Sequence, residues 1–244
     1  MSSNKSGGNI YQGGQICLPP SVIAKLMNLP PEKVSGMRLP RIMEEFAKGF
    51  EFLKHYGKSV TFFGSTRSTE SSKEYQEARQ LAGMFAKEGF AVITGGGPGI
   101  MEAANRGATE AGGKSAGINI QLDAVQNVNP FVQESISFHH FFARKVMLAF
   151  ASEVYIFFPG GFGTLDEFFE ITTLVQTRKI ESIPVILLGK EYWTPLLSWI
   201  EKDLLKKRAA VDAEDVHIYR LAKNIDDAFD TARRLAIRDL VRTA

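Results

Sequence analysis

The sequence has little cysteine and no long apolar run, and both shortages narrow the class of protein. Cys17 is the only cysteine among 244 residues, so no internal disulfide can form and a reducing compartment is expected. No apolar stretch approaches the ~20 residues that a membrane span needs. The first 14 residues, MSSNKSGGNIYQGG, lack the apolar segment of a secretory signal. We therefore expect a cytoplasmic protein with no membrane partner.

The sequence also lacks an excess of charge of either sign. Lysine and arginine number 29 and aspartate and glutamate 27, which gives a net charge of +2. This balance disfavours nucleic acid as the partner. The four histidines show no ligand spacing with cysteine or carboxylates, so neither a metal site nor a cofactor is expected. A hydrophobic share of 44% fits one ordinary α/β domain with a sizeable core.

Apolar segments of strand length alternate with helical segments along most of the chain. Residues 1–57 are interpreted as an N-terminal extension, with 1–14 disordered and a helix over 41–56, and 58–244 as the main domain. The alternation predicts a Rossmann-like, doubly wound parallel sheet flanked by helices, in a single α/β domain. Strands are expected at 59–63, 90–94, 115–121, 135–138, 154–158 and 183–188, and helices at 71–87, 100–111, 139–151, 164–179, 193–207 and 226–241.

Three loops rich in glycine follow predicted strands, at the sheet edge where such folds bind ligands. Glycine has no Cβ, so backbone N–H groups can come close to an anion, above all at the start of a helix. Thr164 is expected to cap the helix that follows the third loop. The candidate contacts to a phosphate-bearing ligand are Gly64, Ser65, Gly95, Gly96, Gly97, Gly160, Gly161, Gly163 and Thr164.

Two common nucleotide motifs are incomplete here. The dinucleotide pattern G-x-G-x-x-G fails because Ile100 and Asp166 occupy the third glycine position of the second and third loops. Gly113-Lys114-Ser115 resembles the end of a P-loop, but Ala108 replaces the earlier glycine and the segment runs from helix to strand. A monophosphate, which needs only one glycine cradle, is therefore the favoured ligand.

Three segments together resemble the LOG family of cytokinin riboside 5′-monophosphate phosphoribohydrolases, often labelled as lysine decarboxylases. They are TGGGPGIMEAAN at 94–105, Arg144-Lys145, and PGGFGTLDE at 159–167, and the similarity covers roughly 59–188. Glu102 stands where compact plant-type members usually carry glycine. In this difference, and in its N-terminal extension and its tail after residue 190, the sequence resembles the longer bacterial members of the family.

The resemblance implies hydrolysis of the N-glycosidic bond of an AMP-like nucleoside 5′-monophosphate, with Arg144 and Glu167 catalytic. It also implies a homodimer or higher homo-oligomer. Such a reaction develops an oxocarbenium-like ribose and negative charge on the leaving base. A carboxylate could stabilise that cation, hold hydroxyls or orient water, and a guanidinium could bind phosphate or the base. Lys145 is a further candidate contact, and Met101 could line a base pocket.

Other interpretations compete with this one. Thr164-x-x-Glu167 is also a capping box, in which Glu167 would only stabilise the helix start. Arg144 lies in a helix that is apolar nearly all round, so it is expected to be buried with anionic company. The alternatives in function are a general AMP or purine–pyrimidine monophosphate nucleosidase, and a non-catalytic protein similar to molybdenum-cofactor carriers. A decarboxylase would need pyridoxal phosphate on a lysine, and no lysine stands in such a setting.

Overall fold

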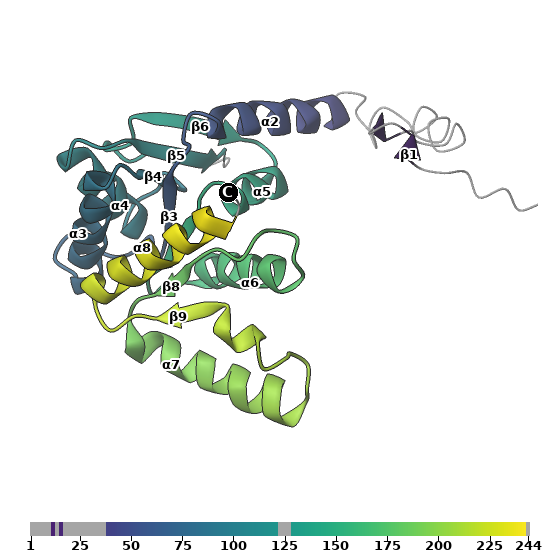
Figure 1. Cartoon of the computed structure of the whole chain (residues 1–244). Helices are drawn as coiled ribbons and strands as arrows, with labels where there is room; N and C mark the ends of the chain where they lie inside the picture. The colour runs from purple at the N-terminus through teal and green to yellow at the C-terminus, as the bar shows by residue number, and fades with distance from the viewer. Residues whose placement is uncertain (1–10, 13–14, 17–37, 122–127, 243–244) are drawn as a thin grey trace, which may run out of the picture. The chain divides into compact units, whose positions relative to one another are not determined.

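The computed structural model describes residues 11–12, 15–16, 38–121 and 128–242. The chain divides into two compact units, Met1–Glu44 and Glu45–Ala244, and the second unit carries the large sheet (Figure 1). Within 1–14, where disorder was expected, the described residues Tyr11–Gln12 form strand β1, which pairs with β2, Gln15–Ile16. The rest of that segment lies outside the described residues.

The main sheet has seven parallel strands in the order β6-β5-β4-β3-β7-β8-β9. Strand β3 lies in the middle, the next three strands extend the sheet on one side, and the last three extend it on the other. The predicted doubly wound α/β fold is therefore confirmed. The strands are β3 Ser59–Phe63, β4 Ala91–Thr94, β5 Ser115–Ile120, β6 Glu134–Phe138, β7 Val154–Phe157, β8 Val185–Leu187 and β9 Tyr219–Leu221.

Helices cover both faces of the sheet, and each face has its own buried core. One core joins the sheet to α3, α4 and α8, and the other joins it to α5, α6 and α7 (Figure 1). Strands β3 and β7 are buried along their whole length, as expected for central parallel strands covered on both sides. The helices are α2 Arg38–Leu53, α3 Lys73–Lys87, α4 Ile100–Glu110, α5 Phe141–Ala149, α6 Phe162–Gln176, α7 Lys190–Trp199, a π-helix Ile200–Lys207, a 3-10 helix Asp215–His217 and α8 Ile225–Arg242.

The direction of winding changes between β3 and β7. These neighbours pair in register from Val60↔Val154 to Phe63↔Phe157, but they are separated in sequence by three other strands. In doubly wound sheets, ligands bind outside the carboxyl ends of the strands at such a switch point. The loops after β3 and β7 begin there, so the fold brings two of the three predicted glycine loops together.

The start of α6 differs from the prediction. The helix begins at Phe162, and Gly161 stands at the N-cap without a side-chain cap. Thr164 therefore lies inside the first turn, and its prediction as the cap is wrong because the chain turns helical two residues earlier. The capping-box interpretation of Glu167 is wrong for the same reason. The first amides of α6 are consequently not satisfied by a capping side chain.

Candidate functional site

Backbone hydrogen bonds join the glycine loops at the carboxyl edge of the sheet. The amide of Ser65, after β3, donates to the carbonyl of Pro159, after β7, at 3.0 Å. The carbonyl of Ser65 accepts from the amide of Ile100, at the start of α4, at the same distance. A Cβ at Gly64 would lie 2.7 Å from the Ile100 side chain. The first predicted loop is therefore packed against the other two.

The second loop requires glycine at Gly96. Its φ of +72° is rare for residues with a side chain, and a Cβ there would lie 1.8 Å from Asn119 Oδ1. The carbonyl of Gly97 accepts a hydrogen bond from Asn129 Nδ2 at 3.0 Å. The contact with Asn119 explains the glycine at position 96 by packing within the protein itself.

The third loop is tight at its start and open beyond it. A Cβ at Gly160 would lie 2.0 Å from Thr164 Oγ1, whereas nothing lies within 4 Å of a Cβ at Gly161 or Gly163. Both of these later glycines are exposed. Tyr192, which the sequence analysis missed, donates its hydroxyl to the Gly160 carbonyl at 2.8 Å and so fixes the loop. The start of α6 thus offers accessible amides on a rigid loop.

Arg144 projects from α5 to the second loop. Its Nε donates to the carbonyl of Ile118 on β5 at 2.8 Å. A Cβ at Gly95 would lie 2.3 Å from Arg144 Nη2 and 2.8 Å from Met101 Sδ, so the fold brings these three predicted site residues together. Burial lowers the pKa of Arg144, and the charge of Glu167 opposes that shift.

Glu167 on α6 is buried, with 6% of its surface exposed. Its Oε2 has no hydrogen-bond partner among the described residues. Burial raises the pKa of Glu167 to about 8, and Glu170 adds to the rise while Arg144 and Lys145 oppose it. Since a buried polar atom normally finds a partner, and perturbed carboxyls cluster at functional sites, Glu167 has the properties of a site residue. Arg144 and Glu167 act on each other electrostatically, so they do not lie on opposite sides of the molecule.

Lys145 binds acidic residues of α6. Its Nζ lies 2.7 Å from Asp166 Oδ2 and 3.3 Å from Glu170 Oε2. Burial acts to lower the pKa of Lys145, but these carboxylates and Glu167 outweigh burial and raise it. Lys145 therefore joins α5 to α6 beside Glu167.

Asn119 is a second residue that the sequence analysis missed. It lies near the carboxyl end of β5, is buried, and its Nδ2 has no hydrogen-bond partner among the described residues. Its side chain contacts the position of Gly96. The sequence feature that could have identified Asn119 is its amide side chain in the otherwise apolar run at 116–120, near the predicted end of that strand.

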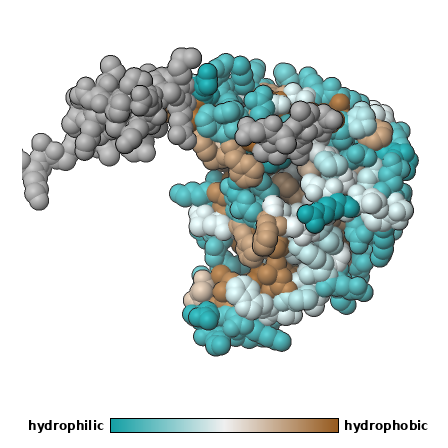
Figure 2. Space-filling model, turned by 180° about the vertical axis from the view of Figure 1, so that it is seen from behind, coloured by the Kyte–Doolittle hydropathy of each residue, from teal (hydrophilic) through white to brown (hydrophobic). Residues whose placement is uncertain are grey.

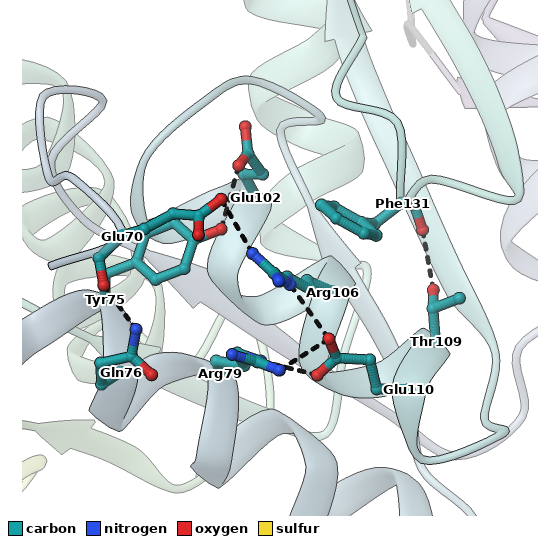
Figure 3. Close-up of polar contacts among 9 residues, drawn as sticks. All are labelled: Glu70, Tyr75, Gln76, Arg79, Glu102, Arg106, Thr109, Glu110 and Phe131. Atoms are coloured by element: carbon teal, nitrogen blue, oxygen red, sulfur yellow. Dashed lines mark hydrogen bonds and ion pairs between the residues drawn. The ribbon is translucent and has the colours of Figure 1, made fainter.

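Glu102, which differs from the plant-type pattern, is bound by α3. Its Oε1 accepts a hydrogen bond from the Tyr75 hydroxyl at 2.9 Å, and Figure 3 shows these two side chains pointing toward one another. Further along α4, Arg106 pairs with Glu70 at 2.9 Å and with Glu110 at 3.0 Å. The glutamate thus has a structural partner that accounts for it.

Not all of helix α5 is buried, in contrast to the expectation from its apolar sequence. Phe141, Phe142 and Phe150 are 52%, 46% and 51% exposed. Figure 2 shows apolar side chains gathered in the middle of one face of the molecule. Ala143, Met147 and Leu148 supply the buried side of the helix, and this side turns Arg144 toward the glycine loops.

Among the residues that the structure describes, no group of three or more histidine, cysteine, aspartate or glutamate side chains is arranged to hold a metal ion. Over the same residues, no helix combines the length and apolarity needed to cross a membrane.

Comparisons with known proteins converge on one family. A family model described as "Possible lysine decarboxylase" matches residues 101–232. A cytokinin riboside 5′-monophosphate phosphoribohydrolase of Rhodococcoides fascians is 30% identical over 147 residues, which cover 59% of this chain and 74% of the relative. A protein of Arabidopsis thaliana named as a probable enzyme of the same activity is 30% identical over 189 residues, which cover 74% and 87% of the two chains.

Solved structures share the fold. The molybdenum cofactor binding protein of Rippkaea orientalis is 25% identical with a TM-score of 0.54, over 72% of this chain and 94% of that one. The molybdenum cofactor carrier protein of Chlamydomonas reinhardtii, at 22% identity and a TM-score of 0.53 over 73% and 97% of the two chains, shows the fold alone. The family model spans more than half of the chain, and named phosphoribohydrolases align with most of their length. The chain therefore belongs to the LOG family, which the "Possible lysine decarboxylase" model describes.

Proposed function

We propose that the protein hydrolyses the N-glycosidic bond of a nucleoside 5′-monophosphate of the cytokinin type, releasing free base and ribose 5-phosphate. Glu167 and Arg144 are the catalytic residues of this proposal. The observation that carries it is a buried carboxyl, Glu167, near the partly buried guanidinium of Arg144 and beside open helix amides. The relatives named as phosphoribohydrolases support the same reaction class.

The open start of α6 is the proposed phosphate site. Gly161 and Gly163 leave room for an anion to approach the backbone, and the helix lacks a side-chain cap. The positive end of the helix dipole favours an anion there. Glu167 lies one turn further along α6, so a ribose attached to the phosphate would reach its carboxyl. Binding the phosphate would position C1′ with energy from a part of the substrate that does not react.

The chemistry then needs only groups that the site supplies and a water molecule. The bond from C1′ to the base nitrogen breaks, and its electron pair remains on the base. Arg144 stabilises the negative charge that develops there, and Glu167 lies where the ribosyl cation forms. The oxygen of water bonds to C1′, one proton of the water is released, and the base nitrogen gains a proton. Ribose 5-phosphate and neutral base are the products.

Incubation with a panel of nucleotides tests the proposal. AMP, other purine and pyrimidine monophosphates, isopentenyl-adenosine monophosphate and the corresponding nucleosides are each incubated with the protein, and free base is measured chromatographically. The proposal expects cleavage of monophosphates, with isopentenyl-adenosine monophosphate best, and little cleavage of nucleosides. Equal rates on all bases would favour a general nucleosidase. Tight binding of a phosphate-bearing ligand recovered intact would favour a carrier and contradict the proposed activity.

The same proposal includes a homodimer in the cytoplasm. Two phenylalanines of α5 and Phe150, which follows the helix, are about half exposed in the isolated chain, and contiguous exposed apolar surface is typical of protein interfaces. The single cysteine supports a reducing compartment.

A further inference from the structure

A second acid accompanies Glu167 on α6. Glu170 follows three residues later, which places both carboxyls on one side of the helix. Glu170 raises the pKa of Glu167, as expected for two acids that lie close together. Oε2 of each is buried and makes no hydrogen bond among the described residues. Two neighbouring carboxylates with buried, unpartnered oxygens repel one another unless they share a proton, so this arrangement needs an explanation.

The charges around the pair do not remove the repulsion. From α5, Arg144 and Lys145 face it, and from α6 itself Asp166 adds a third carboxyl. Lys145 Nζ lies 3.3 Å from Glu170 Oε2, which is close enough for an ion pair but does not form a hydrogen bond. The closer partner of Lys145 is Asp166, at 2.7 Å. Two cations therefore face three carboxyls, and one proton on the pair would balance the charge.

The strand beneath the pair supplies no proton. The charge of Glu167 contributes to the raised pKa of Tyr155 on β7. The Tyr155 hydroxyl, however, already donates to backbone carbonyls, at 2.7 Å to Ala149 and 3.2 Å to Leu148. The proton that relieves the repulsion must then be carried by Glu167 and Glu170 themselves.

We infer that Glu170 is a positioning residue that keeps one proton shared with Glu167, so that the pair can deliver it to the leaving base. This inference rests on the proposed function. As the bond between C1′ and the base nitrogen breaks, the nitrogen keeps the electron pair and takes the shared proton. Water then adds its oxygen to C1′ and returns one proton to the pair. The pair ends each cycle as it began, and water is the only reactant consumed.

Two substitutions test the inference through the pH profile of kcat. In the wild type, kcat should fall at alkaline pH as the shared proton is lost. Glu170→Gln removes the neighbouring negative charge, so this fall should begin at least about one pH unit lower, with KM changed less than about twofold because Glu170 does not contact the phosphate site. Asp166→Asn, which removes the other carboxylate bound to Lys145, should shift the profile less. An unmoved alkaline limb in Glu170→Gln overturns the inference.

A measurement without substrate separates this inference from the proposed function. Carbon-13 NMR titration of the glutamate carboxyls in the folded wild type should show a carboxyl that titrates well above the ordinary range. That signal should move to lower pH in Glu170→Gln and vanish in Glu167→Gln. If every glutamate of the wild type titrates near pH 4–5, the shared proton does not exist. If the high titration is present but no monophosphate is cleaved, the pair stands and the proposed function fails.

Discussion

Glu167 is a carboxyl that folding removes from water without supplying a hydrogen bond to its Oε2. In the unfolded chain it loses its proton near pH 4.5, and in the folded protein near pH 8. Between these values the folded state binds more protons than the unfolded state. The free energy of unfolding therefore falls as pH rises through this window, and Glu167 costs stability at neutral and alkaline pH. Such a cost is typical of a residue kept for function.

Glu167→Gln is predicted to stabilise the protein at alkaline pH, because glutamine cannot ionise. At pH 9 the free energy of unfolding should exceed the wild-type value by roughly 1–3 kcal/mol, and the gain should nearly disappear at pH 4. Urea denaturation at both pH values measures the difference. A gain that is the same at both values would show that the carboxyl has no raised pKa.

Gly163→Ala is predicted to weaken substrate binding while the fold is unharmed. Nothing lies within 4 Å of the added methyl group, and alanine in a helix is more favourable than glycine by about 1 kcal/mol. The methyl group would stand where the phosphate approaches, so KM should rise at least about tenfold, which corresponds to ~1.4 kcal/mol. Gly57→Ala, where a methyl group also meets nothing within 4 Å, is the control and should leave KM unchanged. If KM is unaltered in Gly163→Ala, the substrate phosphate does not bind at the start of α6.

At the scale of elements, α5 carries Arg144 but does not cap its own start. His140 stands at the N-cap without a side-chain cap. Glu45 on α2 binds the backbone just before the helix: its carboxylate accepts from the amides of His139 at 2.8 Å and His140 at 3.2 Å, and lies 3.1 Å from His140 Nδ1. An acid at a helix start also interacts favourably with the helix dipole. Glu45 on α2 thus holds the start of the helix that carries Arg144.

Glu45→Ala should destabilise the protein by about 1.5–3 kcal/mol, the usual cost of losing hydrogen bonds to a charged group, and lower kcat severalfold because the start of α5 loosens. Thermal unfolding and base release measure both effects. Glu51→Ala, on the same helix, removes only an exposed pair with Lys54 and should change neither. If the two variants behave alike, α5 does not depend on Glu45.

The elements that could be predicted from sequence are those that local pattern determines. Strand β3 ends at the predicted residues, and β7 ends one residue early, because a short, mostly apolar run that stops at a glycine or proline defines each strand. Strand β9 has only three residues, too few for a pattern, and was missed. Glu45 binds the backbone of residues 94 and 95 positions further along the chain. The sequence alone could not predict a contact over such a separation. Ser72, not the predicted Ser71, caps α3, since the two serines are adjacent and only the backbone path decides between them.

At the scale of the whole molecule, the order of strands in the sheet brings the glycine loops of the candidate site together. The exposed aromatic side chains are the basis of the proposed dimer. The glycine loops could be predicted as a group because parallel strands end at one edge, whereas Arg144 and Glu167 were expected there from the family resemblance. Their contacts could not be predicted, because Arg144 meets a carbonyl of β5 and Gly95 only after α5 packs on the sheet.

Phe141→Glu is predicted to abolish the proposed dimer. Phe141 is 52% exposed, so a charge there should not disturb the isolated chain but would be buried in an interface. Light scattering after size exclusion should give the mass of one chain for the variant and two for the wild type. The same charge at Trp199 on α7, which is 47% exposed, is the control. A wild type that is already monomeric would refute the dimer.

Comparing two glutamate substitutions tests the central claim most directly. Free base released from the best monophosphate is measured for the wild type, Glu167→Gln and Glu191→Gln, which makes the same chemical change at an exposed position of α7. If Glu167 acts on the substrate, Glu167→Gln should lose on the order of 10²–10⁴-fold in rate while it remains folded, and Glu191→Gln should keep the wild-type rate. A folded Glu167→Gln protein that releases base at the wild-type rate would contradict the account.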